Sequence, residues 1–145
     1  MSDSVIEQVS VFLENSSGRL AQLTRALGDA GIDMHALMVA DTEEFGVVRI
    51  ICDRPQSALS VLEKHGFGVS LTPVTAVEVP DRPGGLAEVL EALGAGGVNV
   101  EYAYCYVKPG ADAAVDVFKV DGINADGVLR DAGFRVLEAS DLYAS

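Results

Sequence analysis

Apolar residues recur along the first half of the chain with two different periods, which predict strands and helices. Val9, Val11 and Leu13 stand at every second position and predict a strand with one buried face. After a turn rich in capping residues, apolar residues recur every three or four positions, the pattern of an amphipathic helix: Leu20, Leu23, Leu27 and Ala30. Gly31 marks the expected end of this helix, because glycine often follows the last helical residue.

The rest of the first half completes a βαββαβ pattern. A mostly apolar run over 32–40 and a Val- and Ile-rich run over 46–52 predict two strands that form a hairpin. Pro55 is well placed at the start of a short second helix. Alternating apolar residues over 67–71 then predict a fourth strand, which ends before Pro73.

The second half of the chain repeats the first. Residues of the same type recur 66 positions apart (84 − 18 = 66), and the clearest pairs are Gly18 with Gly84, Leu20 with Leu86, Ala21 with Ala87, Leu27 with Leu93 and Gly31 with Gly97. Residues 66–69 and 133–136 match at an offset of 67, so one shift of register aligns the two halves. The repeat predicts two modules, residues 1–73 and 74–145, each with the same fold.

The predicted fold class is α+β, with two tandem ferredoxin-like βαββαβ modules. Each has an antiparallel sheet with both helices on one face, which leaves the other face open. Tyr102, Tyr104 and Tyr106 project from one side of a predicted strand and suit packing against another sheet, module or subunit. The alternative is that they fill part of their own module's core. Open faces and edges need covering, so we expect a homo-oligomer, most simply a dimer.

Composition and charge exclude several partners. The 145 residues are 49% hydrophobic and 22% charged, enough apolar material for a folded protein, and the formal net charge is −12. An acidic protein repels phosphate groups, so we expect no nucleic acid and no membrane partner. No apolar run is long enough to cross a bilayer. The N-terminus lacks a basic segment followed by an apolar one, so we expect a cytoplasmic protein.

The sequence contains no recognisable catalytic or metal-binding group. Cys52 and Cys105 lie in apolar strand-like runs and are expected to be buried free thiols. His35 and His65 have no partner at metal-ligand spacing, so we expect neither a metal nor another cofactor. There is no Ser/His/Asp or Cys/His grouping, no phosphate loop and no inward pair of carboxylates, so we expect no enzyme activity.

The segment Asp81-Arg82-Pro83-Gly84-Gly85-Leu86 joins a predicted strand to a predicted helix. We expect Asp81 to accept hydrogen bonds from the first helical amides, and Pro83 to lie in the first helical turn. Gly84 and Gly85 lack a β-carbon, so another backbone or a small ligand can approach closely. Free amides and the helix dipole then offer a site for a carboxylate. The alternative is a capped loop that only joins strand to helix.

This segment, with the following helix and Gly97-Val98-Asn99-Val100, resembles the ACT domain, a small ferredoxin-like regulatory module that binds amino acids. The first copy, Asn15-Ser16-Ser17-Gly18-Arg19-Leu20 with Gly31-Ile32-Asp33-Met34, is similar, but Ser17 stands where the pattern usually has proline. The resemblance covers nearly the whole chain as a tandem pair.

The resemblance implies an amino acid bound between the strand–helix loop of one module and the second strand of a neighbouring module. The implied ligand-binding residues are Asn15, Ser16, Ser17, Gly18, Arg19, Leu20, Asp33, Met34, Asp81, Arg82, Pro83, Gly84, Gly85, Leu86, Asn99 and Val100. The glycines would admit the ligand and the loop amides would bind its carboxylate, while Asp33 and Asn99 would bind its polar groups from across the interface. The arginines would add charge or be solvated. The second loop matches the pattern better.

The function that follows is a non-enzymatic, amino-acid-binding regulatory or sensor protein. The sequence shows no attached catalytic domain, so we expect regulation to act through a separate partner. The alternative is a regulatory subunit or assembly module of an enzyme of amino-acid metabolism, which acts by protein contact without a ligand.

Overall fold

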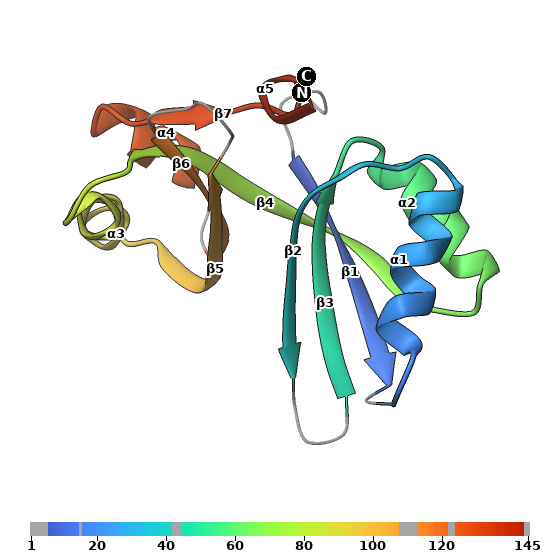
Figure 1. Cartoon of the computed structure of the whole chain (residues 1–145). Coiled ribbons are helices and arrows are strands. Elements are labelled where there is room, and N and C mark those ends of the chain that lie inside the picture. Colours follow the sequence, from blue (N-terminus) through green and yellow to red (C-terminus); the bar gives the residue numbers. More distant parts are fainter. Residues whose placement is uncertain (1–5, 15, 42–44, 108–112, 122–123, 144–145) are drawn as a thin grey trace. The chain divides into compact units, whose positions relative to one another are not determined.

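The computed structural model describes residues 6–14, 16–41, 45–107, 113–121 and 124–143 (Figure 1). The described chain divides into two compact units, Glu7–Thr72 and the segment from Pro73 onward together with Ile6. We call them module 1 and module 2.

Module 1 has the predicted βαββαβ order. Its elements are β1 (Ile6–Glu14), α1 (Arg19–Asp29), β2 (Met34–Asp41), β3 (Phe45–Cys52), α2 (Pro55–Lys64) and the first part of β4 (Gly68–Pro80). Strand β3 lies between β1 and β2 and is antiparallel to both. Both helices cover one face of the sheet (Figure 1). Val9, Val11 and Leu13 are buried in the core on that face, as their spacing predicts.

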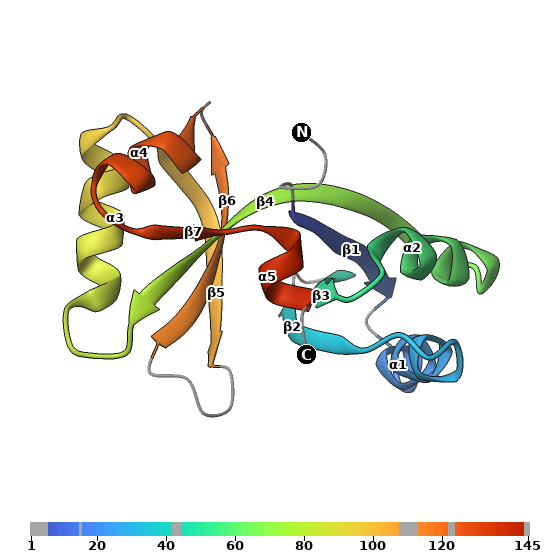
Figure 2. The same cartoon turned by 90° about the horizontal axis from the view of Figure 1, so that it is seen from above.

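Module 2 repeats this arrangement. It contains the second part of β4, α3 (Gly85–Ala95), β5 (Asn99–Val107), β6 (Ala113–Asp121), α4 (Ala125–Asp131) and the short β7 (Arg135–Leu137). Strand β6 is antiparallel to β4 and β5, and β7 pairs with β4. Helices α3 and α4 lie on the same face of this sheet (Figure 2). A last helix, α5 (Ala139–Tyr143), was not predicted. The α+β class and the two ferredoxin-like modules are confirmed.

The prediction that a strand ends before Pro73 is wrong, because β4 continues through Pro73 to Pro80. Proline removes a backbone donor, so a strand tolerates it only where no ladder partner needs that donor. Pro73 is exposed, and the ladder between β4 and β6 begins only at Thr75. The position therefore requires no backbone donor for that ladder.

The two cysteines differ. Cys52 is fully buried, as expected, and burial raises the pKa of its thiol to about 11. The expectation that Cys105 is buried is wrong, because it is exposed on β5. Strand β5 stands at one end of the strand order and has a neighbouring strand, β6, on one side only. An apolar run on such an edge strand does not ensure burial.

The row of tyrosines does not fill the helix-side core of module 2. Tyr104 pairs across the sheet with Val117, whereas the adjacent Cys105 pairs with Asp116 on the face that carries the core. Tyr102, Tyr104 and Tyr106 therefore project from the face opposite the helices, where all three are half-buried. Packing of this row against a partner surface stays a prediction.

Candidate functional site

The loops that precede α1 and α3 are the same kind of turn. We call residues 15–18 loop 1 and residues 81–84 loop 2. In loop 2 the amide of Gly85 donates to the Arg82 carbonyl at 3.0 Å, and Gly84 has φ 85° and ψ −9°. In loop 1 the amide of Arg19 donates to Ser16 at 3.4 Å, and Gly18 has φ 88° and ψ −10°. These values define a type II turn, whose third residue needs positive φ and therefore favours glycine.

This turn corrects the expected roles of Asp81 and Pro83. The residues that precede the two helices are Gly18 and Gly84, and neither helix start has a side-chain cap. Asp81 is therefore not a cap. Pro83 lies in the turn, outside α3, because the helix begins at Gly85. Proline suits the second position of a type II turn, since its φ is fixed near the required value.

Ser17 occupies the proline position in loop 1, which leads to a testable expectation. Ser17→Pro should stabilise module 1 by about 0.4–1 kcal/mol, because proline restricts the unfolded chain and the turn accepts its φ. Chemical denaturation of the variant beside the wild-type chain measures the change. A loss of stability would show that the backbone at Ser17 departs from the conformation of Pro83.

Gly85 is required by its own module. A β-carbon at this position would overlap the carbonyl oxygen of Pro80 and lie 3.2 Å from Cγ1 of Val79. The first residue of α3 therefore packs directly against the end of β4. The equivalent residue in module 1 is Arg19, which carries a full side chain. The close approach at Gly85 is to this chain's own backbone.

The two loop arginines both have partners within their own modules. The Arg19 guanidinium lies over the Phe67 ring, 4.3 Å from its centroid, and donates to Gln22 Oε1 at 2.8 Å. Arg82 pairs with Glu88 at 2.7 Å. Glu88 is the acidic residue of the first turn of α3, so Arg82 offsets a negative charge next to the loop.

Each helix start presents free backbone amides. The first helical hydrogen bond of α3 joins the amide of Glu88 to the Gly84 carbonyl at 3.1 Å. The amides of Leu86 and Ala87 precede this bond, so the helix supplies no acceptor for them. Leu20 and Ala21 occupy the same positions in α1, before the bond from Gln22 to Gly18. Two neighbouring donors and the positive end of the helix dipole favour an anion.

The second half of the predicted site, Asp33 and Asn99, lies at the opposite end of each sheet from the loop of the same module. Asp33 directly precedes β2 instead of lying within it, and its amide donates to Asp53 Oδ1 at 3.2 Å. Asn99 is the first residue of β5, opposite Asp121. The pairing places the start of β2 beside the end of β3, whereas loop 1 follows the opposite end of the sheet. The same holds in module 2. No single module brings the two halves together.

The remaining predicted residues divide between surface and core. Leu20 and Leu86 are exposed beside the loops, at 38% and 45%. Met34 and Val100 are partly buried and pack against the cores of their modules. Asn15 lies outside the described residues.

Sequence reasoning missed a buried carboxylate close to loop 2. Asp116 on β6 is 5% exposed and shares a row across the sheet with Val77 on β4 and Cys105 on β5. Its side chain hydrogen-bonds to Cys105, and burial raises the pKa of the Asp116 carboxyl. Burial also raises the pKa of the Cys105 thiol, and the charge and hydrogen bond of Asp116 raise it further.

This contact predicts the reactivity of the exposed thiol. Asp116→Asn should lower the pKa of Cys105 and speed its alkylation by iodoacetamide at neutral pH, because the thiolate is the reactive form. Cys52 should contribute little, since it is buried and its pKa is about 11. Cys105→Ser supplies the background rate. An unchanged rate in Asp116→Asn would contradict the contact.

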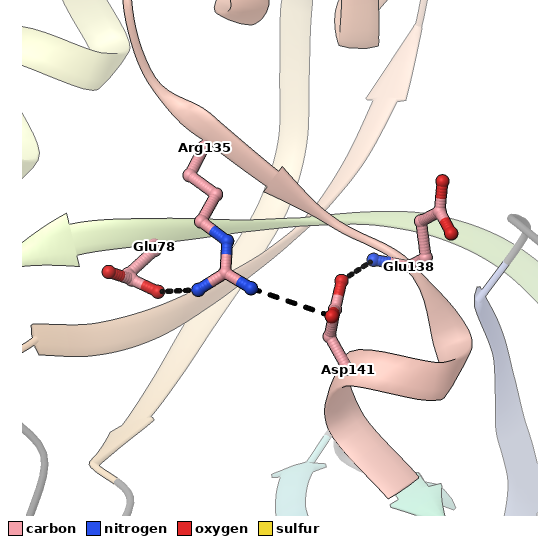
Figure 3. A network of polar contacts seen from close by, with 4 residues as sticks. All are labelled: Glu78, Arg135, Glu138 and Asp141. Atoms are coloured by element: carbon pink, nitrogen blue, oxygen red, sulfur yellow. Dashed lines mark hydrogen bonds and ion pairs between the residues drawn. The ribbon is translucent and has the colours of Figure 1, made fainter. Parts of the chain in front are cut away.

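A surface hollow of about 440 Å³ is lined by residues of loop 2, β4, α3 and the start of β7, and its lining includes two ion pairs. One is Arg82–Glu88, and the other joins Arg135 to Glu78 at 2.9 Å. Arg135 also lies 3.5 Å from Asp141, whose second carboxylate oxygen accepts the amide of Glu138 at 2.8 Å (Figure 3). This network links β4, β7 and α5. The charged residues that line the hollow are thus paired within module 2.

Comparison with known proteins decides the family. The sequence matches the family described as "ACT domain pair" over residues 4–144. The chain belongs to the ACT domain pair family. Among the described residues, no group of three or more His, Cys, Asp or Glu side chains is arranged to hold a metal ion. No helix in the same part of the chain is long and apolar enough to span a membrane.

Solved structures share this ACT pair fold. The protein BT0572 from Bacteroides thetaiotaomicron is 36% identical, with a TM-score of 0.91 and 98% of both chains covered. The regulatory subunit of aspartate kinase from Thermus thermophilus, in its ligand-free form, is 20% identical, with a TM-score of 0.69, and 90% of this chain and 95% of that one are covered. The regulatory subunit from Thermus flavus is 19% identical, with a TM-score of 0.66 and coverage of 90% and 92%. No curated protein matches the sequence.

Proposed function

We propose that this ACT domain pair is a non-enzymatic regulatory protein that binds a free amino acid at loop 2. The observation that carries the proposal is the start of α3, where a type II turn without a side-chain cap leaves the amides of Leu86 and Ala87 available. These donors and the helix dipole suit the carboxylate of an amino acid. Pro83 fixes the turn in advance, which lowers the entropy lost when a ligand binds.

A second copy of the chain completes the binding site. Its ammonium group needs acceptors, and Asn99 offers an amide oxygen. Asn99 lies at the opposite end of its own sheet from loop 2, so it does not reach a ligand at the loop of its own module. Asn99 of a second copy would take this role, in a homodimer. Binding then favours one packing of the two copies, and this difference is what a partner enzyme senses.

The partner enzyme belongs to amino-acid metabolism. Support comes from the fold shared with subunits that are named as regulatory subunits of aspartate kinase. The likeness to those subunits establishes the fold only, so which enzyme is regulated rests on the ligand that the protein selects.

A thermal-shift and calorimetry screen with the common amino acids tests the function. A ligand of the folded state raises its stability by mass action, by about 2.7 kcal/mol at a concentration of 100 Kd. We expect at least one amino acid to raise the melting temperature. If none does so at millimolar concentration, ligand binding is wrong, and assembly by protein contact alone becomes the better account.

A matched pair of variants tests the place of binding. Ala87→Pro removes one amide donor from loop 2, and proline is tolerated in the first turn of a helix. Ala21→Pro makes the same change at the equivalent position before α1. Binding should be lost in Ala87→Pro and retained in Ala21→Pro. Retention in both variants would remove the helix amides from the site.

A further inference from the structure

The row of residues that contains Asp116 differs between the two modules at two of its three positions. In module 1 the corresponding row is Val11, Val48 and Val39, three valines on adjacent strands. In module 2 it is Val77, Asp116 and Cys105. The valine that is fully buried in the middle of the first row is thus replaced by a carboxylate that is only 5% exposed in the second.

Asp116 has few hydrogen-bond partners within its own module. A carboxylate accepts about four hydrogen bonds, and a thiol such as Cys105 is a weak donor. None of the ion pairs between described residues includes Asp116. Burying a carboxylate with so few partners costs stability that a valine in the same place would not cost. The fold itself does not need Asp116.

Asp116 lies close to the start of α3. The next row along the same face contains Val79, and a β-carbon at Gly85 would lie 3.2 Å from Val79 Cγ1. Neighbouring residues on one face of a strand are about 7 Å apart. Asp116 therefore lies one row further into the sheet than Val79, the residue beside the start of α3. Cys105, which shares the row of Asp116, is exposed, and so are Val107 on the same strand and Leu86 at the start of α3, at 55% and 45%.

We propose that Asp116 binds the side chain of the amino acid at loop 2, and that the site selects side chains ending in a hydrogen-bond donor, which is a hydroxyl, an amide or an ammonium group. This inference rests on the proposed function. The ligand carboxylate lies on the amides of Leu86 and Ala87, and its side chain extends from there to Asp116 on β6. In the empty site the Cys105 thiol donates to Asp116, and the ligand's donor takes its place. Module 1, with Val48 in the row, has no such selectivity.

Calorimetry with pairs of amino acids of similar shape tests this selectivity. The pairs are threonine with valine, asparagine with leucine, and lysine with norleucine, which lacks the terminal ammonium group; in each, only the first member has a side-chain donor. In the wild-type chain the donor member of at least one pair should bind tenfold or more tightly, because a buried acceptor without a partner penalises the other member. In Asp116→Val, which copies module 1, that preference should disappear, and Asp116→Asn should give an intermediate result.

A second readout follows Cys105. The preferred amino acid should slow the alkylation of Cys105 in the wild-type chain, because it covers the thiol and occupies its acceptor. Equal affinities within every pair, or a preference that survives in Asp116→Val, would overturn the inference and leave the proposed function intact. If no amino acid binds the wild-type chain, the proposed function fails and this inference falls with it. The melting temperature of each variant verifies that it is folded.

Discussion

Gly85→Ala is expected to destabilise module 2 by about 2–3 kcal/mol, the cost typical of adding a methyl group to a packed site. The new β-carbon would overlap the carbonyl oxygen of Pro80. A backbone oxygen cannot move to another rotamer, so the start of α3 must shift instead. Such a shift also displaces the amides of Leu86 and Ala87, and the affinity for the amino acid should fall. Chemical denaturation and the ligand thermal shift measure the two effects.

Gly94→Ala is the matched control for this prediction. Gly94 lies in the same helix, and a β-carbon there would meet no atom within 4 Å. Alanine should stabilise the helix by about 0.5–1 kcal/mol, because glycine loses more backbone entropy on folding. Opposite signs for the two substitutions would assign the effect at Gly85 to the contact with Pro80. Equal and small effects would show that α3 can slide along β4 without cost.

In contrast to Gly85→Ala, Asp116→Val is expected to stabilise the protein at neutral pH by about 1–3 kcal/mol. This is the penalty typical of a buried polar group with too few hydrogen-bond partners. Valine occupies the equivalent position in module 1, so the shape of the row is compatible. Cys105 is exposed and can turn to solvent when its acceptor is removed. A large gain in stability combined with a loss of ligand selectivity would show that Asp116 is retained for binding.

The size of this gain should depend on pH. Burial raises the pKa of Asp116 above its ordinary value of 3.8, so folding disfavours the ionised form. Below the unfolded pKa the carboxyl is protonated in both states and its effect on stability is most favourable. That contribution is lost as the pH rises through the higher folded pKa. The advantage of Asp116→Val should therefore be larger at about pH 8 than at about pH 4. A gain independent of pH would contradict the buried carboxylate.

Most of the fold was predictable from the repeat, because its helices and strands follow local patterns of apolar residues. Val9, Val11 and Leu13 are buried as their alternation predicts, and so are Leu23 and Leu27 of the helical stripe, whereas Leu20 and Ala30 at the ends of that stripe are exposed. The continuity of β4 was not predictable in this way. Proline usually breaks a strand, and its tolerance at Pro73 depends on where the pairing with β6 begins. That pairing is a tertiary property.

The loops show the same distinction. Gly84 and Pro83 indicate a turn, and the sequence did place one at the start of a helix. The sequence fits a helix that starts after Asp81 as well as one that starts after Gly84. The turn type decides between them, and the structure has Gly84 before the helix. Asp116 was missed because it stands in an apolar strand where alternation allows an exposed polar residue. The row that buries it joins three strands, and the repeat changes offset from 66 to 68 there (116 − 48 = 68), so the single shift to 67 expected from the sequence does not align this strand.

The central claim is that an amino acid binds to the amides at the start of α3, and two-dimensional amide NMR tests it most directly. The labelled chain would be titrated with a mixture of the common amino acids at millimolar concentration. We predict that the amide signals of Leu86 and Ala87 move strongly downfield, as expected for new hydrogen bonds to a carboxylate. Leu20 and Ala21, at the equivalent positions of loop 1, serve as the internal control and should move little. Unchanged signals at Leu86 and Ala87 would contradict the account.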